Sequence, residues 1–246
     1  MRSAIAVWRL LRVLQHILSG LWTIWRAFPK LTQAERDART QAWAQALLAK
    51  LRIELVVRGL PAEGPVLLVA NHISWLDIVA MQASRHCRFI SKSEVRHWPL
   101  VGLLAAGAGT LFIERASRRD AMRVVHQMAE RLRAGDVLAV FPEGTTGDGT
   151  RVLPFHGNLL QAAISVNVPV QPVALKFADA ASGRDSLVPC YIGQDTLVHS
   201  LWRTARTNGL QAVVLYGESQ TAQGRDRRQW ADDARAAIVA LRGDSQ

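Results

Sequence analysis

The sequence predicts an α/β protein: a layered, largely parallel or mixed sheet flanked by helices, with an N-terminal helical membrane-docking segment. Two observations support this fold class. From Ile53 onward, short runs of β-prone residues alternate with helical stretches, and the runs are apolar throughout. Such runs are typical of strands that helices cover on both faces. Before them, residues 1–30 form an almost wholly apolar stretch of their own.

The stretch from Ala4 to Phe28 predicts an α-helix that lies in the membrane interface. Arg9, Arg12 and His16 interrupt its apolar run, which leaves no charge-free stretch of the roughly 18 residues that a spanning helix needs. The polar side chains recur every three or four residues and therefore share one stripe of a helix: Arg9, Arg12, His16, Ser19, Thr23 and Arg26. We expect the broad apolar face to enter the membrane and the cations to meet anionic headgroups.

Two other interpretations fit this stretch less well. A helix in the core of a soluble protein would not need so broad an apolar face. A signal peptide would have no arginines inside its apolar region and would end in a small-residue cleavage site, which is missing here.

The remaining chain predicts one more front helix and then an alternating domain. Thr32 to Leu51 predicts a helix beside the first, since Thr32 and Glu35 have the spacing of a capping box. The strand candidates are Ile53–Val57, Val66–Ala70, Thr110–Ile113, Val137–Phe141, Val170–Leu175 and Ala212–Tyr216. The later helix candidates are Ser74–Ala83, Ser117–Arg133, Asn158–Asn167 and Arg225–Leu241. No repeat or long linker divides the chain, so we expect residues 1–50 to dock on the membrane and residues 51–246 to form one domain.

The charge balance indicates an anionic partner. Lys and Arg number 30 and Asp and Glu 20, a net charge of +10. Nucleic acid, an anionic lipid surface, or a phosphorylated or acidic carrier would match it. The basic residues are spread along the chain without a basic-aromatic motif, so we expect no nucleic-acid partner. The two cysteines, Cys87 and Cys190, are far apart and lack zinc-ligand spacing, which excludes a disulfide framework and a zinc module.

The leading catalytic candidate is His72, in the sequence Asn-His-Ile-Ser-Trp-Leu-Asp directly after the strand candidate Val66–Ala70. Ser74 and Asp77 have the spacing of a helix start, so His72 is expected in a strand-to-helix turn, where α/β proteins place their sites. From the first helical turn, Asp77 can fold back onto the imidazole. A histidine held in this way can act as a general base. The alternative is an ordinary capping aspartate beside a surface histidine.

Further polar groups follow other predicted strands. Glu143, Gly144 and Thr145 combine a carboxylate, a glycine and a hydroxyl in one loop, which we interpret as a binding rim, and Arg151 returns a cation to that loop. Arg115 follows the strand candidate 110–113, and its planar fork suits an anionic headgroup. The sequence has no G-x-x-x-x-G-K-[ST] loop, G-x-S-x-G elbow or H-E-x-x-H pair, which removes nucleotide, hydrolase-elbow and zinc sites.

Four blocks in this order make the chain similar to the lysophospholipid acyltransferase family. They are Asn71–Asp77 (N-H-x4-D), Gly109–Arg115, Phe141–Thr145 (F-P-E-G-T) and Val168–Val173 (V-P-V-x-P-V). The resemblance covers roughly residues 50 to 220. It implies that residues 51–246 are an acyltransferase domain.

The resemblance implies transfer of a fatty acyl group from acyl-CoA or acyl-carrier protein to the free hydroxyl of a lysolipid. His72, oriented by Asp77, would take the hydroxyl proton as the oxygen attacks the thioester, without an acyl-enzyme, a metal or a cofactor. The residues that would order the acceptor pocket or hold its anionic headgroup are Glu143, Gly144, Thr145, Arg115, Lys92 and Arg151. Because acceptor and product are membrane lipids, we expect the protein at the cytoplasmic face of the inner membrane.

Several activities stay open at this point. The first acceptor is 1-acylglycerol-3-phosphate, which would give phosphatidic acid. Family members that use it commonly have Arg where this chain has Thr146, so a phosphate partner is missing unless Arg151 replaces it. A related branch that acylates lyso-ornithine lipids resembles this chain at Thr146 and in the segment Tyr191–Leu197. A thioester hydrolase and a basic membrane- or nucleic-acid-binding module are the remaining alternatives.

Overall fold

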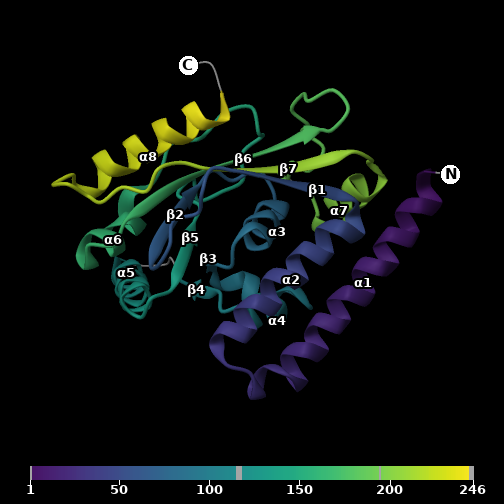
Figure 1. The fold of residues 1–246 in the computed structure, drawn as a ribbon, viewed down its shortest axis with the longest axis horizontal. Helices are drawn as coiled ribbons and strands as arrows, with labels where there is room; N and C mark the ends of the chain where they lie inside the picture. The colour runs from purple at the N-terminus through teal and green to yellow at the C-terminus, as the bar shows by residue number, and fades with distance from the viewer. Residues whose placement is uncertain (1, 115–117, 194, 244–246) are drawn as a thin grey trace.

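Seven strands form one sheet in the computed structural model, which describes residues 2–114, 118–193 and 195–243. The strands are β1 (Ile53–Arg58), β2 (Val66–Ala70), β3 (Arg88–Lys92), β4 (Leu111–Ile113), β5 (Val137–Val140), β6 (Val170–Asp179) and β7 (Leu210–Tyr216). Their order is β1-β7-β6-β2-β5-β3-β4, and every neighbouring pair is parallel except β6 and β7 (Figure 1). The sheet is therefore mixed and largely parallel, which confirms the predicted fold class.

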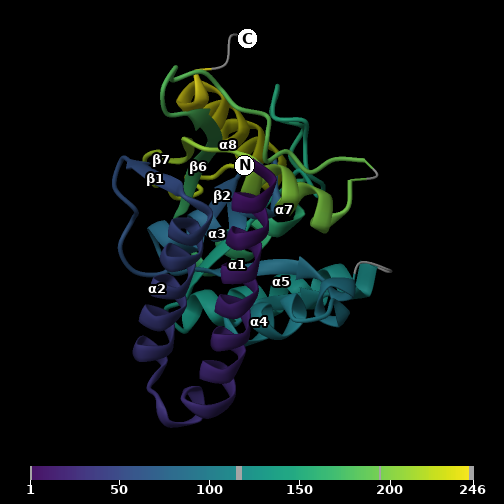
Figure 2. The same ribbon diagram turned by 90° about the vertical axis from the view of Figure 1, so that its right-hand side faces the viewer.

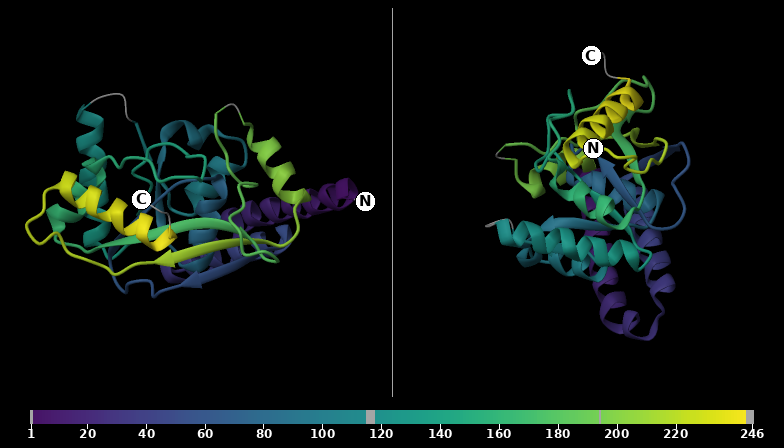
Figure 3. Two further views of the ribbon diagram at one scale, coloured as in Figure 1. Left: turned by 90° about the horizontal axis from the view of Figure 1, so that it is seen from above. Right: turned by 90° about the vertical axis from the view of Figure 1, so that its left-hand side faces the viewer.

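Helices cover both faces of the sheet (Figure 3). One face carries α2 (Gln33–Leu51), α3 (Trp75–Ser84) and α7 (Leu197–Arg206); the other carries α5 (Arg118–Arg133), α6 (Leu160–Val166) and α8 (Arg227–Arg242). Successive residues of β2 alternate between these layers: Leu68 and Ala70 pack in the first, Leu67 and Val69 in the second, and all four are fully buried. Burial on both faces explains why the run is apolar throughout.

Three elements were not predicted: β3, α4 (Val101–Gly107) and α7. β3 begins with Arg88, a residue that argues against a buried strand. Arg88 is nevertheless buried, because its guanidinium pairs with Asp136 at a distance of 3.1 Å. α7 was not predicted for a similar reason. Its inward-facing residues include the polar Ser200 and Thr204, which are fully and almost fully buried. Buried residues that are charged or carry a hydroxyl group interrupt the apolar runs from which strands and helices are predicted.

α1 (Arg2–Arg26) and α2 form an antiparallel hairpin that extends beyond the sheet, with the short turn η1 (Phe28–Lys30) at its tip (Figures 1 and 2). The two helices pack side by side, as predicted. His16 stacks on Trp43 with ring centroids 4.8 Å apart, and His16 Nε2 donates to the Trp43 carbonyl over 2.9 Å. The predicted capping box of Thr32 and Glu35 begins α2.

The prediction that the cations of α1 meet anionic headgroups is wrong for Arg9. Arg9 is only 2% exposed, and it donates to the carbonyls of Ala205 (2.9 Å) and Thr207 (2.7 Å) at the C-terminal end of α7. Helix C-termini leave carbonyls without intrahelical partners, so this buried cation meets their partial negative charge. Arg12 and Arg26 remain exposed.

The outward face of α1 is apolar. Its large exposed apolar side chains are Ile5, Val7, Trp8, Leu11, Leu14, Leu18, Trp22 and Trp25. By length and composition alone, Ser3–Lys30 could cross a membrane, a criterion that core helices and signal sequences also meet.

Candidate active site

The predicted catalytic residue His72 and the predicted binding residue Glu143 follow the carboxyl ends of two neighbouring strands. β2 and β5 are parallel, with Val69 opposite Val140. The chain leaves β2 toward His72 and leaves β5 toward Glu143. The two turns therefore meet at one edge of the sheet, where open α/β sheets bind their ligands.

A hydrogen bond of 2.9 Å joins His72 Nδ1 to Asp77 Oδ2. Asp77 is the third residue of α3 and forms the predicted capping box with the N-cap Ser74. The same Oδ2 atom accepts from the amides of Ile73 (2.6 Å) and Ser74 (2.8 Å). Asp77 is fully buried, whereas the His72 side chain is 17% exposed. One carboxylate thus caps the helix and also orients the imidazole, with Nε2 on the far side of the ring.

The His72 ring lies flat against Phe141. Their ring centroids are 4.0 Å apart and the ring planes differ by 11°. Phe89 of β3 stacks behind Phe141 at 5.9 Å. No role was predicted for Phe141, because the sequence does not show that the strand ending there lies next to the His72 strand. The aromatic contact and the Asp77 hydrogen bond together restrict the imidazole to one orientation.

Glu143 follows the neighbouring strand β5 and forms a hydrogen bond with the turn that contains His72. Its Oε1 accepts from the His72 amide over 2.6 Å, and its Oε2 accepts from the Leu153 amide over 3.0 Å. Burial raises the pKa of the Glu143 carboxyl group, while these two hydrogen bonds act in the opposite direction. Since both oxygens bind backbone amides, Glu143 positions His72 and leaves no carboxylate oxygen without a protein donor.

The loop after Glu143 closes around the same turn. The Gly144 amide donates to the Phe141 carbonyl over 3.1 Å, and Gly144 has a φ of 72°, a conformation that favours glycine. The Gly147 amide donates to the His72 carbonyl over 2.8 Å. Thr145 is exposed between them. The structure therefore brings the predicted rim of Glu143, Gly144 and Thr145 next to His72.

The predicted cations are more widely spread. Lys92 is exposed at the end of β3, which lies on the other side of β5 from β2. Arg151 is exposed in the loop after β5. There, hydrogen bonds from Thr150 and, more weakly, the charge of Arg151 lower the pKa of Asp148. Arg115 lies outside the described residues.

Residues 187–193 were not predicted to belong to the site, yet they lie against it. The Tyr191 amide donates to the Ile73 carbonyl over 3.1 Å, and the Thr146 hydroxyl donates to the Tyr191 carbonyl. The only sequence signal was the resemblance of the segment from Tyr191 to Leu197 to one branch of the family.

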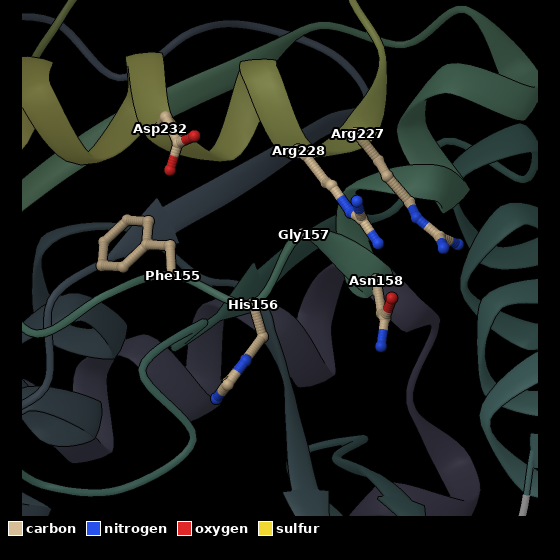
Figure 4. Close-up of a pocket in the computed structure, with 7 residues that line it drawn as sticks. All are labelled: Phe155, His156, Gly157, Asn158, Arg227, Arg228 and Asp232. Atoms are coloured by element: carbon tan, nitrogen blue, oxygen red, sulfur yellow. The ribbon is translucent and has the colours of Figure 1, made fainter.

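Two surface hollows lie apart from these residues. The first, of about 320 Å³, is shown in Figure 4, where Arg227 and Arg228 extend from α8 toward the chain at Gly157 and Asn158. The second, of about 370 Å³, lies beside β4 and α5. Neither hollow is lined by a predicted site residue. Within the described part of the chain, no three His, Cys, Asp or Glu side chains gather as metal ligands would.

Comparisons with known proteins identify the family of the chain. A family model described as Acyltransferase matches residues 54–176. The chain is 40% identical over 209 residues to a lyso-ornithine lipid O-acyltransferase of Pseudomonas aeruginosa, covering 85% of this chain and 80% of that protein. It is 37% identical over 215 residues to a 1-acyl-sn-glycerol-3-phosphate acyltransferase of Neisseria gonorrhoeae, covering 85% and 82%.

The fold also matches a solved structure, that of the 1-acyl-sn-glycerophosphate acyltransferase PlsC from Thermotoga maritima. The TM-score is 0.73 at 20% identity, and the match covers 99% of this chain and 97% of that one. At this identity the match establishes the shared fold.

Proposed function

We propose that this chain, which belongs to the lysophospholipid acyltransferase family and is an acyltransferase, acylates the free hydroxyl of a membrane lysolipid, with His72 as general base. The acyl donor is acyl-CoA or acyl-carrier protein. The acceptor expected first is 1-acylglycerol-3-phosphate, which yields phosphatidic acid. No cofactor is needed, because the thioester itself supplies the activated acyl group.

The observation that carries this proposal is the bond from His72 Nδ1 to the buried Asp77 carboxylate. Nδ1 donates in this bond, so Nε2 keeps its lone pair and can accept the lysolipid hydroxyl proton. The oxygen then forms a bond to the thioester carbon. As the tetrahedral intermediate collapses, the carbon–sulfur bond breaks and the thiolate takes the proton from Nε2. Asp77 stabilises the imidazolium between these two steps.

The neighbouring groups suit the binding of an anionic lipid. Glu143 and Gly144 order the loop beside His72, and Thr145 offers an exposed hydroxyl there. Lys92, Arg151 and Arg115 are the cations that we assign to the anionic headgroup.

A second acceptor, a lyso-ornithine lipid, is favoured by the contact of Thr146. Its hydroxyl donates to the Tyr191 carbonyl and so is not available as a donor to a substrate phosphate. The Pseudomonas aeruginosa relative carries that activity in its name.

We further propose that residues 1–50 dock the enzyme on the membrane, at the cytoplasmic face of the inner membrane, and that residues 51–246 form the acyltransferase domain. The support is the outward apolar face of α1, with Trp22 62% and Trp25 68% exposed. Tryptophans favour the headgroup boundary, and the exposed Arg12 and Arg26 suit anionic lipids.

Acyl transfer to the two lysolipids tests this function. Labelled acyl-CoA and acyl-carrier protein are offered with 1-acylglycerol-3-phosphate and with lyso-ornithine lipid, to the unsubstituted chain and to His72→Ala. We expect transfer that the His72→Ala variant loses by about 10³-fold or more. The matched control is His126→Ala, since His126 is an exposed histidine of α5.

Two results would contradict the proposal. Fatty acid release that is equally fast without any lysolipid would indicate a thioester hydrolase. Transfer that His72→Ala retains would remove His72 as the base.

A further inference from the structure

Arg235 of α8 donates hydrogen bonds to the loop that follows β5. Its Nη2 donates to the Val152 carbonyl over 2.7 Å, and its Nε donates to the carbonyls of Val152 (3.2 Å) and Leu153 (3.0 Å). Val152 is buried and Arg235 is half-buried. A charged donor forms a stronger hydrogen bond with a carbonyl than a neutral donor does. The guanidinium therefore fastens this part of the loop to α8.

The same part of the loop binds Glu143. The carbonyl of Val152 and the N–H of Leu153 belong to one planar peptide group. The carbonyl of that group accepts from Arg235, and its N–H donates to Glu143 Oε2 over 3.0 Å. Glu143 Oε1 in turn accepts from the His72 amide over 2.6 Å. A continuous chain of hydrogen bonds thus leads from the Arg235 guanidinium to the turn that contains His72.

Arg235 reaches this loop from the layer of helices opposite to that of His72. α3 begins just after the His72 turn and packs on one face of the sheet, and Phe141, which stacks on His72, packs in the same layer. α8 packs on the other face, where its Trp230 and Ile238 are buried. Through the loop after β5, a residue of the second layer can therefore act on a turn of the first.

Glu143 accepts from both amides only when it is ionised. A carboxylate has two acceptor oxygens, whereas a protonated carboxyl group carries a hydrogen on one of them. Burial raises the pKa of Glu143, and the amides of His72 and Leu153 lower it. The charge of His72 also lowers this pKa, and the charge of Asp77 raises it. Arg235 favours the ionised form, because a cation bound to the carbonyl of a peptide polarises that peptide and makes its N–H a stronger donor.

We propose that Arg235 is a positioning residue of the transfer reaction, which acts on the turn that contains His72 through the Val152–Leu153 peptide and the Glu143 carboxylate. Arg235 needs no contact with the acyl donor, the acceptor or the reacting atoms. The inference rests on the proposed function and adds to it a residue outside the four sequence blocks.

A double-mutant cycle tests this inference with the acyl donors and lysolipids of the function test. Arg235→Met keeps an apolar stem and removes the charge, and we expect kcat to fall about 10- to 100-fold with little change in the KM of donor or acceptor. Glu143→Gln should lower kcat at least as much, because its NH2 group would face an amide N–H. Since both residues act through one carboxylate, the variant with both substitutions should be no slower than Glu143→Gln alone.

Three further readouts separate positioning from a general stabilisation of the fold. Arg235→Lys keeps a cationic donor and should recover most of kcat. In Arg235→Met the pKa of Glu143 should rise, so the loss of kcat relative to the unsubstituted chain should be largest at acid pH and shrink as rising pH ionises Glu143 again. The His72 amide, which donates to Glu143, should exchange its hydrogen faster in Arg235→Met.

Arg242→Met is the matched control. Arg242 lies two turns further along α8 and donates to the Gly149 carbonyl of the same loop over 2.6 Å. The N–H of that peptide, on Thr150, donates to Asp148 rather than to Glu143. The effect of Arg242→Met on kcat, whatever its size, should therefore multiply with that of Glu143→Gln and should not depend on pH.

The outcomes distinguish this inference from the function on which it rests. An unchanged kcat in Arg235→Met, a loss that is the same at every pH, or losses that multiply in the cycle would overturn the inference and leave the acyltransferase function standing. No His72-dependent transfer to either lysolipid would overturn both. If Arg235→Met does not fold, Arg235→Gln, which keeps a neutral donor, takes its place in the cycle with the same expected and contradicting results.

Discussion

At the scale of single residues, Asp77 has several structural roles in the site at once. One of its oxygens accepts from the His72 ring and from the amides of Ile73 and Ser74. The other oxygen, Oδ1, is buried without a hydrogen bond from any described residue. The same side chain therefore ends the strand-to-helix turn, begins α3 and sets the tautomer of His72.

The substitution Asp77→Asn tests the role of the negative charge of this side chain separately from that of its shape. Asp77→Asn keeps the size of the side chain, but its neutral amide cannot stabilise an imidazolium and can present a donor to Nδ1, which selects the wrong tautomer. We expect kcat to fall by about 10⁴-fold while acceptor KM changes little. Steady-state transfer rates across pH measure this. Asp232→Asn, an exposed aspartate of α8, is the control, and a loss of less than tenfold would argue that Asp77 only caps the helix.

At the scale of elements, α1 presents two different faces. The inner face packs on α2 and α7 and contains Arg9, His16 and Val13, all wholly or partly buried. The outer face carries the exposed tryptophans and leucines. The helix is therefore part of the folded domain on one side and free to meet a bilayer on the other.

Arg9 fastens the inner face of α1 to α7. In Arg9→Met the carbonyls of Ala205 and Thr207 lose their donor, and we expect the free energy of unfolding to fall by roughly 1–3 kcal/mol. Urea denaturation measures that change, and limited proteolysis within α1 should accelerate. Arg12→Met is the matched control, because the Arg12 guanidinium lies at the surface over the Trp8 ring, 4.6 Å from its centroid. Equal stability of the two variants would show that the buried contact contributes nothing.

At the scale of the whole molecule, a series of hydrogen bonds connects α1 to the turn that contains His72. Arg9 joins α1 to α7, and Arg203 joins α7 to residues 187–193. Tyr191 in turn joins that segment to the His72 turn. Figure 2 shows α7 beside α1. A membrane-docking helix held in this way would place the His72 turn at a defined position relative to the bilayer that supplies the lysolipid.

Membrane binding can be tested without removing α1. Deleting residues 1–30 would also remove Arg9 and uncover the core, whereas Trp22→Ser with Trp25→Ser changes only the outer face. We expect the double variant to bind vesicles that contain anionic lipid about 30- to 1,000-fold more weakly, because each tryptophan loses about 1–2 kcal/mol of apolar burial. Sedimentation with vesicles measures this. Leu60→Ser, 85% exposed and outside α1, should bind normally, and unaltered binding of the double variant would exclude the outer face as the docking surface.

Much of the fold and the centre of the site followed from local patterns. The run Val66–Ala70 predicted a strand covered on both faces, because every one of its side chains must be apolar when two helical layers enclose it. The contact of His72 with Asp77 followed from their spacing, because a capping box is formed within one helical turn. Four ordered blocks indicated the family.

The sequence by itself therefore determined the fold class, the His72–Asp77 pair and the apolar front helix. Only the tertiary structure decided that Arg9 is buried against α7, that Glu143 accepts from the His72 amide, and that residues 187–193 lie beside the His72 turn. These contacts join residues far apart in the chain, 71 positions for His72 and Glu143 and 196 for Arg9 and Ala205. Their partners are brought together by the order of the strands in the sheet, and spacing along the sequence carries no record of that order.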